Sequence, residues 1–280
     1  MLAELLVPVF LPGIALLGLL LVLKTGNRSN WAGFAAGLVL SIATLVGFAY
    51  EGAWPTSFSD WHNLPLLLSA AGFLTVALVR CPGSIQSWCA PIALGTLSAA
   101  LGDFPDMSTP DRVVFGISVL VSVRLWMLAC QSSMGRLVGV AAWTSCVAIA
   151  PMALDGGFTT LMVLSASGAT IAGALVLVPQ ALSVGGGGGM LLGVLLPSLA
   201  CCGFAYDYAE APWWQWAGVA FLPVGVIVFF EPVRSPDDKL RRPWASGLFR
   251  SMVIIILLGW LLQPTILSLV APADDPYGSY

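Results

Sequence analysis

Charged side chains are scarce in this sequence, and their scarcity excludes a water-soluble fold. They make up 9% of the 280 residues, whereas hydrophobic residues make up 58%. A typical soluble domain has about a quarter charged residues. Mean hydropathy is +0.92. A soluble chain of this composition could not cover its core with polar surface. The surroundings that remain are lipid, so the sequence predicts an integral membrane protein whose first partner is the bilayer.

Residue types that support chemistry within a membrane are also missing. His62 is the only histidine, so the chain cannot ligate a haem iron with two histidines of its own. Lys24 and Lys239 are the only lysines, and both lie in connecting segments, where they cannot carry a Schiff base within a span. No apolar segment has Asp or Glu at its centre, which excludes the buried carboxylate relay of a proton-driven pump. We expect no catalytic residue, no metal and no cofactor, and an enzyme is the least favoured class.

Signatures of nucleotide and nucleic-acid binding are absent as well. Five consecutive glycines end at Gly189, but no Lys-Ser/Thr pair follows them, so the run is interpreted as a linker and not as a P-loop. A net charge of −3 provides no basic surface for nucleic acid. The six cysteines fit no metal-ligand spacing.

Long apolar runs are what the sequence does contain. Runs such as "GIALLGLLLVL" lack the alternation of a membrane β-strand, and helices satisfy every backbone polar group internally. We expect an all-α polytopic bundle of about ten transmembrane helices, one membrane domain over residues 1–280 with no soluble domain. Ten spans also allow a division into halves, about 1–130 and 131–280. The predicted segments are 5–23, 31–50, 64–80, 87–102, 113–130, 136–153, 158–178, 188–205, 213–230 and 249–270.

The fourth segment, 87–102, differs from the others. It is short, only mildly apolar, and carries Pro91 and Gly95. A short span and a re-entrant segment are both compatible with it.

The distribution of charge predicts an orientation. Cytoplasmic loops of membrane proteins are enriched in Lys and Arg. If all ten segments span, every basic residue except Arg112 falls on one side. Every acidic residue outside loop 231–248 then falls on the other side. We therefore expect a multi-pass protein of the cell membrane, with loop 231–248 in the cytoplasm and both termini outside.

Arg124 is the most deeply placed charge. It lies six residues from the expected helix end, a distance of about 9 Å that an arginine can largely span by snorkelling. One interpretation is an interfacial anchor beside Trp126. The other is a cationic contact for an anionic substrate or lipid headgroup.

Small polar residues and prolines supply the other candidates for a substrate path. Ser165, Ser167 and Thr170 lie in segment seven, where they could serve helix packing or line a polar path. Pro197 and Pro223 lie near the middles of segments eight and nine, and each removes one helical hydrogen bond. Since an unsatisfied carbonyl is costly in hydrocarbon, we expect both prolines to face the protein interior, bordering a cavity if the protein is a carrier.

Polar residues at the outer rim form a further group of candidates. Asp207, Glu210 and His62 could bind a cation or a partner there, or simply be solvated.

Two functions fit these observations. The first is a permease or carrier for a small molecule or lipid, with a neutral or amphipathic substrate. It is favoured by ten spans, helix-breaking prolines and the lack of an extramembrane domain. The second is a non-catalytic transmembrane subunit or scaffold of a larger membrane complex, with other membrane subunits as partners. It is favoured by small-residue stripes, aromatic rims and the lack of a chemical site.

Overall fold

The computed structural model describes residues 2–26, 31–50, 63–78, 83–102, 104, 107–132, 135–178, 187–229 and 243–270 of the chain. All regular elements in these ranges are helices, so the all-α prediction is confirmed, and helices occupy the described parts of all ten predicted segments. In chain order they are α1 (Leu2–Thr25), α2 (Ala32–Tyr50), α3 (Leu64–Ala77), α4 (Gly83–Leu101), α5 (Thr109–Ser132), α6 (Gly135–Asp155), α7 (Thr159–Leu177), α9 (Gly187–Ala205), α10 (Trp213–Phe229), α11 (Pro243–Leu261) and α12 (Gln263–Val270).

Length and hydropathy suit several of these helices to a membrane. Among the described residues, α1, α5, α6, α7 and α9 are long and apolar enough to cross a bilayer. The pair α11 and α12 makes a sixth candidate if the two count as one bent span. Shorter apolar stretches lie in α2, α3, α4 and α10. A membrane-embedded helical bundle is therefore supported, whereas the count of ten spans stays a prediction.

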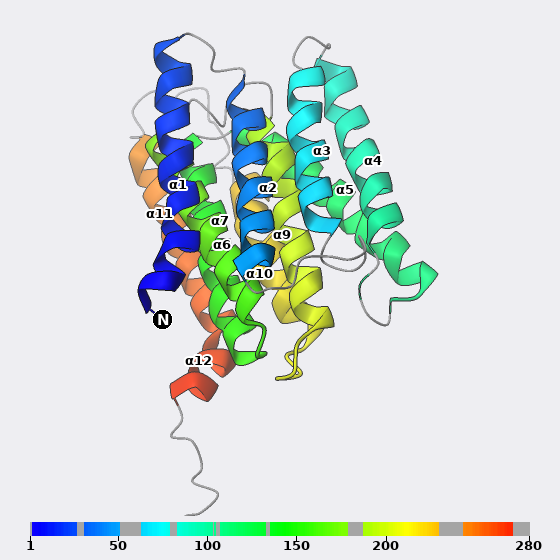
Figure 1. Cartoon of the computed structure of the whole chain (residues 1–280), viewed down its shortest axis with the longest axis vertical. Helices are drawn as coiled ribbons and strands as arrows, with labels where there is room; N and C mark the ends of the chain where they lie inside the picture. The colour runs from blue at the N-terminus through cyan, green and yellow to red at the C-terminus, as the bar shows by residue number, and fades with distance from the viewer. Residues whose placement is uncertain are drawn as a thin grey trace, which may run out of the picture.

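The fourth segment is one continuous helix. α4 has 19 residues, which span about 28 Å at 1.5 Å per residue. It contains Pro91 and contacts both α3 and α5. In Figure 1 it runs along the bundle beside α3 and ends far from where it begins. A re-entrant segment would instead return to the side that it entered.

Alternating helix directions gather charges of opposite sign at opposite ends of the bundle. The start of α1 and all of α12 lie at the same end (Figure 1). Asp111, Asp155, Asp207 and Glu210 lie at this acidic end, together with one basic residue, Arg112. The described basic residues toward the other end are Lys24, Arg124, Arg136 and Arg250. The folded chain thus has the two-sided charge distribution on which the predicted orientation depends.

The last predicted loop and span need correction. Loop 231–248 is shorter than predicted, because α11 already begins at Pro243, and proline is favoured at the first helical position. The remaining loop residues, 231–242, and the C-terminal residues 271–280 lie outside the described part of the chain. Segment 249–270 is also broken, with a bend of 56° between the end of α11 and α12. Pro264 cannot donate a helical hydrogen bond there, which accounts for the break.

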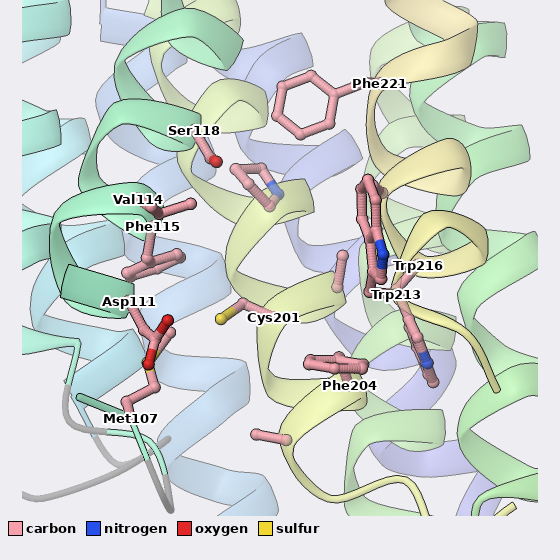
Figure 2. A pocket seen from close by; sticks show the side chains of 14 residues that line it. Met107, Asp111, Val114, Phe115, Ser118, Cys201, Phe204, Trp213, Trp216 and Phe221 are labelled. Atoms are coloured by element: carbon pink, nitrogen blue, oxygen red, sulfur yellow. The ribbon is translucent and has the colours of Figure 1, made fainter. Parts of the chain in front are cut away.

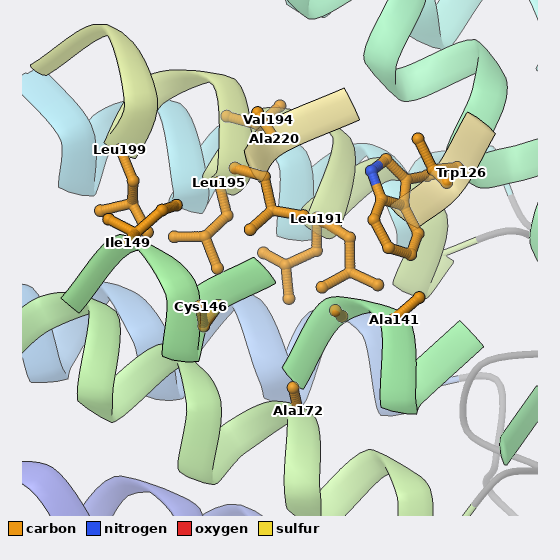
Figure 3. Packing of buried hydrophobic residues seen from close by; sticks show 14 of the residues in the cluster. Trp126, Ala141, Cys146, Ile149, Ala172, Leu191, Val194, Leu195, Leu199 and Ala220 are labelled. Carbon is orange, nitrogen blue, oxygen red and sulfur yellow. The ribbon is translucent and has the colours of Figure 1, made fainter. Parts of the chain in front are cut away.

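Glycines bring the backbones of neighbouring helices into direct contact around the central helix, α9. Residues 188–200 of α9 are all buried. A Cβ atom on Gly193 would lie 2.3 Å from Val123 Cα of α5, and one on Gly189 would lie 2.7 Å from the Met127 backbone nitrogen. Only glycine permits this approach. On the opposite side, Figure 3 shows Leu195 and Leu199 of α9 packed beside Ile149 of α6.

Other helix pairs meet in the same way. Gly37 of α2 faces Gly72 of α3, where an added Cβ would lie 2.9 Å from the Gly72 Cα. Gly95 of α4 faces Gly116 of α5, where an added Cβ would lie 2.8 Å from the Gly116 carbonyl oxygen. Small residues at such interfaces let helices associate by van der Waals packing, which matters in lipid because water does not drive the helices together.

We predict that Gly193→Ala destabilises the protein. The added methyl group would overlap Val123 of α5, and overpacking of this kind costs about 1–3 kcal/mol. The matched control is Gly259→Ala on α11, since a Cβ there meets nothing within 4 Å. Thermal unfolding of the purified protein in detergent measures both effects. Equal unfolding temperatures for the two variants would contradict the close contact between α5 and α9.

Candidate functional site

Ser167, a predicted path residue, joins α7 to α1. Its Oγ lies 2.7 Å from the carbonyl oxygen of Pro8 and 2.9 Å from that of Val163. Pro12 has no N–H, so the Pro8 carbonyl, four residues earlier, lacks its helical donor. The Val163 carbonyl already faces a backbone N–H within α7. We therefore assign the single hydroxyl proton of Ser167 to a hydrogen bond with the Pro8 carbonyl oxygen.

The two other candidates on α7 differ from each other. Thr170 Oγ1 donates to the carbonyl of Val9 at 2.7 Å, at the point where Gly13 of α1 packs against Thr170. Ser165 is fully buried, and its hydroxyl has no hydrogen-bond partner among the described residues. Thr170 thus adds a second contact between α7 and α1, and a role of these hydroxyls in a substrate path stays a prediction.

Arg124 reaches α4. Its Nη1 atom lies 3.4 Å from the Ser87 carbonyl oxygen, and its guanidinium carbon lies 5.0 Å from the centre of the Trp88 ring. Pro91, four residues after Ser87, has no N–H to donate to that carbonyl, and the guanidinium lies within hydrogen-bonding reach of it. The prediction that Arg124 lies beside Trp126 at the membrane interface is wrong, because Trp126 is fully buried in the core. Two residues along a helix turn a side chain by about 200°, which points Trp126 away from Arg124.

Pro197 and Pro223 are both buried, as expected for prolines that face the protein interior. Gly203 of α9 packs against Trp216 of α10. The two helices are antiparallel, so positions equally far from this contact lie at the same level. Pro197 lies six residues before Gly203, and Pro223 lies seven residues after Trp216. They therefore interrupt α9 and α10 at nearly the same depth.

Pro197 also borders a pocket of about 490 Å³ between α5, α9 and α10 (Figure 2). Pro223 is not among the residues that line it. Pockets that bind small molecules typically have volumes of about 300–1,000 Å³. The lining consists of Met107, Asp111, Val114, Phe115, Ser118, Pro197, Ala200, Cys201, Phe204, Ala205, Trp213, Trp216, Ala217 and Phe221.

The pocket extends from the acidic end of the bundle toward its middle. Asp111 lies in the first turn of α5, and Ser118 follows seven residues later, about 10 Å further along the helix. Figure 2 shows Asp111 near Met107 at one end of the pocket and Phe221 across from Ser118 at the other. Near the acidic end, Val114 is 61% exposed. The pocket is therefore open near the bundle end and enclosed by buried side chains deeper down.

A hydrogen-bonded turn at the start of α5 holds Asp111. The backbone N–H of Ser108 donates to Asp111 Oδ2 at 3.0 Å, and the Ser108 hydroxyl donates to the same oxygen. The backbone contact is one half of a capping box, and the dipole at this helix N-terminus also stabilises a negative charge. Asp111 was not among the residues predicted from the sequence, although "SxxD" before an apolar run is a signal for this turn.

Asp207, a predicted rim residue, organises the connection between α9 and α10. Its carboxylate accepts hydrogen bonds from two backbone N–H groups of this connection at 2.9 and 3.0 Å. It also accepts one from the indole N–H of Trp216 at 2.9 Å, which fixes a wall of the pocket. Glu210 is exposed, with a φ of 55°. His62 lies outside the described residues.

Arg250 is a buried charge that the sequence analysis did not consider as a site. It is 7% exposed, and its Nε has no hydrogen-bond partner among the residues that the structure describes. Gly218 of α10 packs against Leu261 of α11, and the two helices are antiparallel. Phe229 lies eleven residues after Gly218, and Arg250 lies eleven residues before Leu261, so the two residues lie at the same level of the bundle. Phe229 ends α10, and the C-terminal end of a helix carries partial negative charge that stabilises a cation. This position indicates a structural role.

No three His, Cys, Asp or Glu side chains come together as a metal-binding group in the described part of the chain. The thiol of Cys201 points into the pocket (Figure 2).

A double-mutant cycle tests the role of Ser167. Ser167→Ala should lower the free energy of unfolding by about 1 kcal/mol, because the Pro8 carbonyl loses its donor. In a Pro12→Ala background the new N–H of residue 12 can bond the same carbonyl, so Ser167→Ala should cost much less there. Ser165→Ala is the control, since its hydroxyl donates to no described residue. Additive effects of Ser167→Ala and Pro12→Ala would contradict the assignment.

Substitutions of Arg124 test its contact with α4. Arg124→Lys keeps a cation near the Trp88 ring and the Ser87 carbonyl, so it should change thermal stability little. Arg124→Leu removes both interactions and should lower the unfolding free energy by about 1 kcal/mol. Stability is measured by thermal unfolding, with ligand or lipid retention followed in parallel. A Lys variant that is as stable as wild type but retains less lipid would favour the alternative role in binding an anionic headgroup.

Comparisons with protein-family models, with curated proteins and with solved structures found no match to this chain.

Proposed function

We propose that this protein is a carrier of the cell membrane that binds an amphipathic small molecule or lipid in the pocket between α5, α9 and α10. The observation that carries the proposal is the composition of this pocket. Its volume is about 490 Å³, and aromatic and aliphatic side chains form most of its wall. Of the described residues that line it, one is charged: Asp111, which lies near the acidic end of the bundle.

The shape of the pocket matches the way an amphipath lies in a bilayer. The polar part of such a molecule stays at the membrane surface, while its apolar part extends toward the membrane centre. Asp111 lies where α5 enters the bundle, and Phe115, Pro197 and Phe221 provide an apolar lining beyond it. The exposed side chains of Val114 and Trp213 flank the entrance from α5 and α10. Access from the outer leaflet follows if the acidic end faces outward.

The two buried prolines provide a means of movement. Each lacks one helical hydrogen bond, so α9 and α10 can bend at these positions at lower cost than a regular helix. The prolines lie at nearly the same depth, and Pro197 borders the pocket. Bending at this level would change the width of the pocket. This is the property that a carrier needs in order to release its ligand toward the other side.

A second candidate is a non-catalytic subunit of a larger membrane complex. Every residue of α9 from 188 to 200 is buried, and most of them are apolar. A centre packed in this way suits a scaffold at least as well as a transporter. Purification in a mild detergent separates the two functions, because a scaffold should retain partner chains in stoichiometric amounts.

Transport is tested by filling the pocket. The protein is reconstituted into liposomes with a fluorescent single-chain amphipath, and movement between leaflets is followed by adding an impermeant quencher. We expect the wild type to accelerate this movement over protein-free liposomes. Ala200→Phe should return the rate to background, because Ala200 is buried in the pocket wall and a phenyl ring would occupy the ligand volume.

Two further variants keep the result interpretable. Ala93→Phe introduces the same ring at an exposed position of α4, outside the pocket, and should leave transport intact. Ser118→Phe fills the pocket from α5 and replaces Ala200→Phe if that variant does not fold. A wild-type rate equal to that of protein-free liposomes would contradict the carrier function and favour the subunit.

A further inference from the structure

We propose that the pocket selects amphipaths with a positively charged head, of the class of single-chain amines and alkylammonium compounds. This inference rests on the proposed binding function of the same pocket. It places the ammonium group beside Asp111 and the chain along the apolar wall between α5, α9 and α10.

The first argument is the sign of the charge at the entrance. Among the described residues that line the pocket, Asp111 is the only charged one, and none is basic. Its carboxylate is partly compensated by the N-terminal end of α5, which carries roughly half a positive charge. A full negative charge exceeds that partial charge, so the Asp111 carboxylate keeps an attraction for cations, and the neighbouring Arg112 is half-buried and not among the lining residues. An anionic head would be repelled, and a zwitterionic head would bring its phosphate close to the same carboxylate.

The second argument is the position of Asp111. Ser108 donates both its backbone N–H and its hydroxyl to Oδ2, and these two contacts hold the carboxylate in one orientation. The side chain is exposed at the pocket mouth, where an ammonium group can reach it without losing all of its hydration. An ion pair at such a site contributes a modest preference and needs little desolvation.

The third argument is the aromatic content of the entrance. Trp213 and Phe204 line the pocket and are 66% and 51% exposed. Figure 2 shows both across the pocket from Asp111. Aromatic faces attract ammonium groups, and tryptophan does so most strongly. Carboxylate and aromatic faces on opposite walls therefore favour the same kind of head.

The apolar part of the ligand is accounted for by the deeper lining. Phe115 and Pro197 are buried, and Phe221 lies across the pocket from Ser118 (Figure 2). The distance from Asp111 to the level of Ser118 is about 10 Å along α5. A single alkyl chain can follow this wall while its head stays at the entrance.

Three ligands with one chain and different heads test the proposal. Dodecyltrimethylammonium, dodecyl maltoside and dodecyl sulfate carry a cationic, a neutral and an anionic head on the same chain. Each is titrated, below its micellar concentration, into the full-length protein in lipid nanodiscs. Specific binding is the difference between wild type and Ala200→Phe, which removes the contribution of the lipid. We expect the cationic ligand to bind about fivefold more tightly than the neutral one, and the anionic ligand to bind most weakly.

Substitution of Asp111 completes the test. Asp111→Asn should reduce the ratio of cationic to neutral binding to about one, while the amide oxygen can still accept hydrogen bonds from Ser108. Asp155→Asn removes a carboxylate at the same end of the bundle but outside the pocket, and it should preserve the wild-type ratio. Equal affinities of the wild type for cationic and neutral ligands would overturn the head preference. If Ala200→Phe reduced no ligand's binding, the pocket itself would fail as the site.

Discussion

Close approach of helix backbones at glycines is the constraint on which the rest of this structure depends. In lipid, apolar side chains gain little by leaving their surroundings, so helices associate where their surfaces fit closely. Gly189 and Gly193 allow α9 to lie directly against α5. Gly95 and Gly116 bring α4 against the same helix. α5 is thereby fixed between α4 and α9, and its outer face toward α10 forms one wall of the pocket.

Close packing also explains how polar groups at membrane depth are used. A helix within reach of its neighbour can donate to a carbonyl whose position in the helix faces a proline, which has no N–H. Ser167 does so for Pro8 of α1, and Arg124 does so for Ser87 of α4. A buried carbonyl left unsatisfied costs about 1–3 kcal/mol, so these contacts stabilise the helices that the prolines interrupt. Pro197 differs from these prolines because it borders a pocket. The position at which α9 lacks a helical hydrogen bond therefore lies beside a space that can hold a ligand.

Hydropathy and charge made much of the fold predictable. Apolar runs located all ten segments, and the alternation of loop charge anticipated the acidic and basic ends of the bundle. The beginning of α11 was missed because Pro243 and the residues after it precede the apolar run, so hydropathy alone counted them as loop. The contact of Arg124 with Trp88 could not be predicted, since sequence does not say which helices are neighbours. The pocket was missed for the same reason, because its walls come from helices far apart in the chain.

The central claim is that an amphipath occupies the space between α5, α9 and α10. Photo-crosslinking tests it most directly, using an amphipath with a diazirine at the end of its chain and the wild-type protein in nanodiscs. Mass spectrometry of the peptides then locates the adducts. The account predicts adducts concentrated on the residues that surround the chain end, around Pro197, Ser118 and Phe221. Adducts spread over the exposed faces of α1 and α11, with none in the pocket, would contradict it.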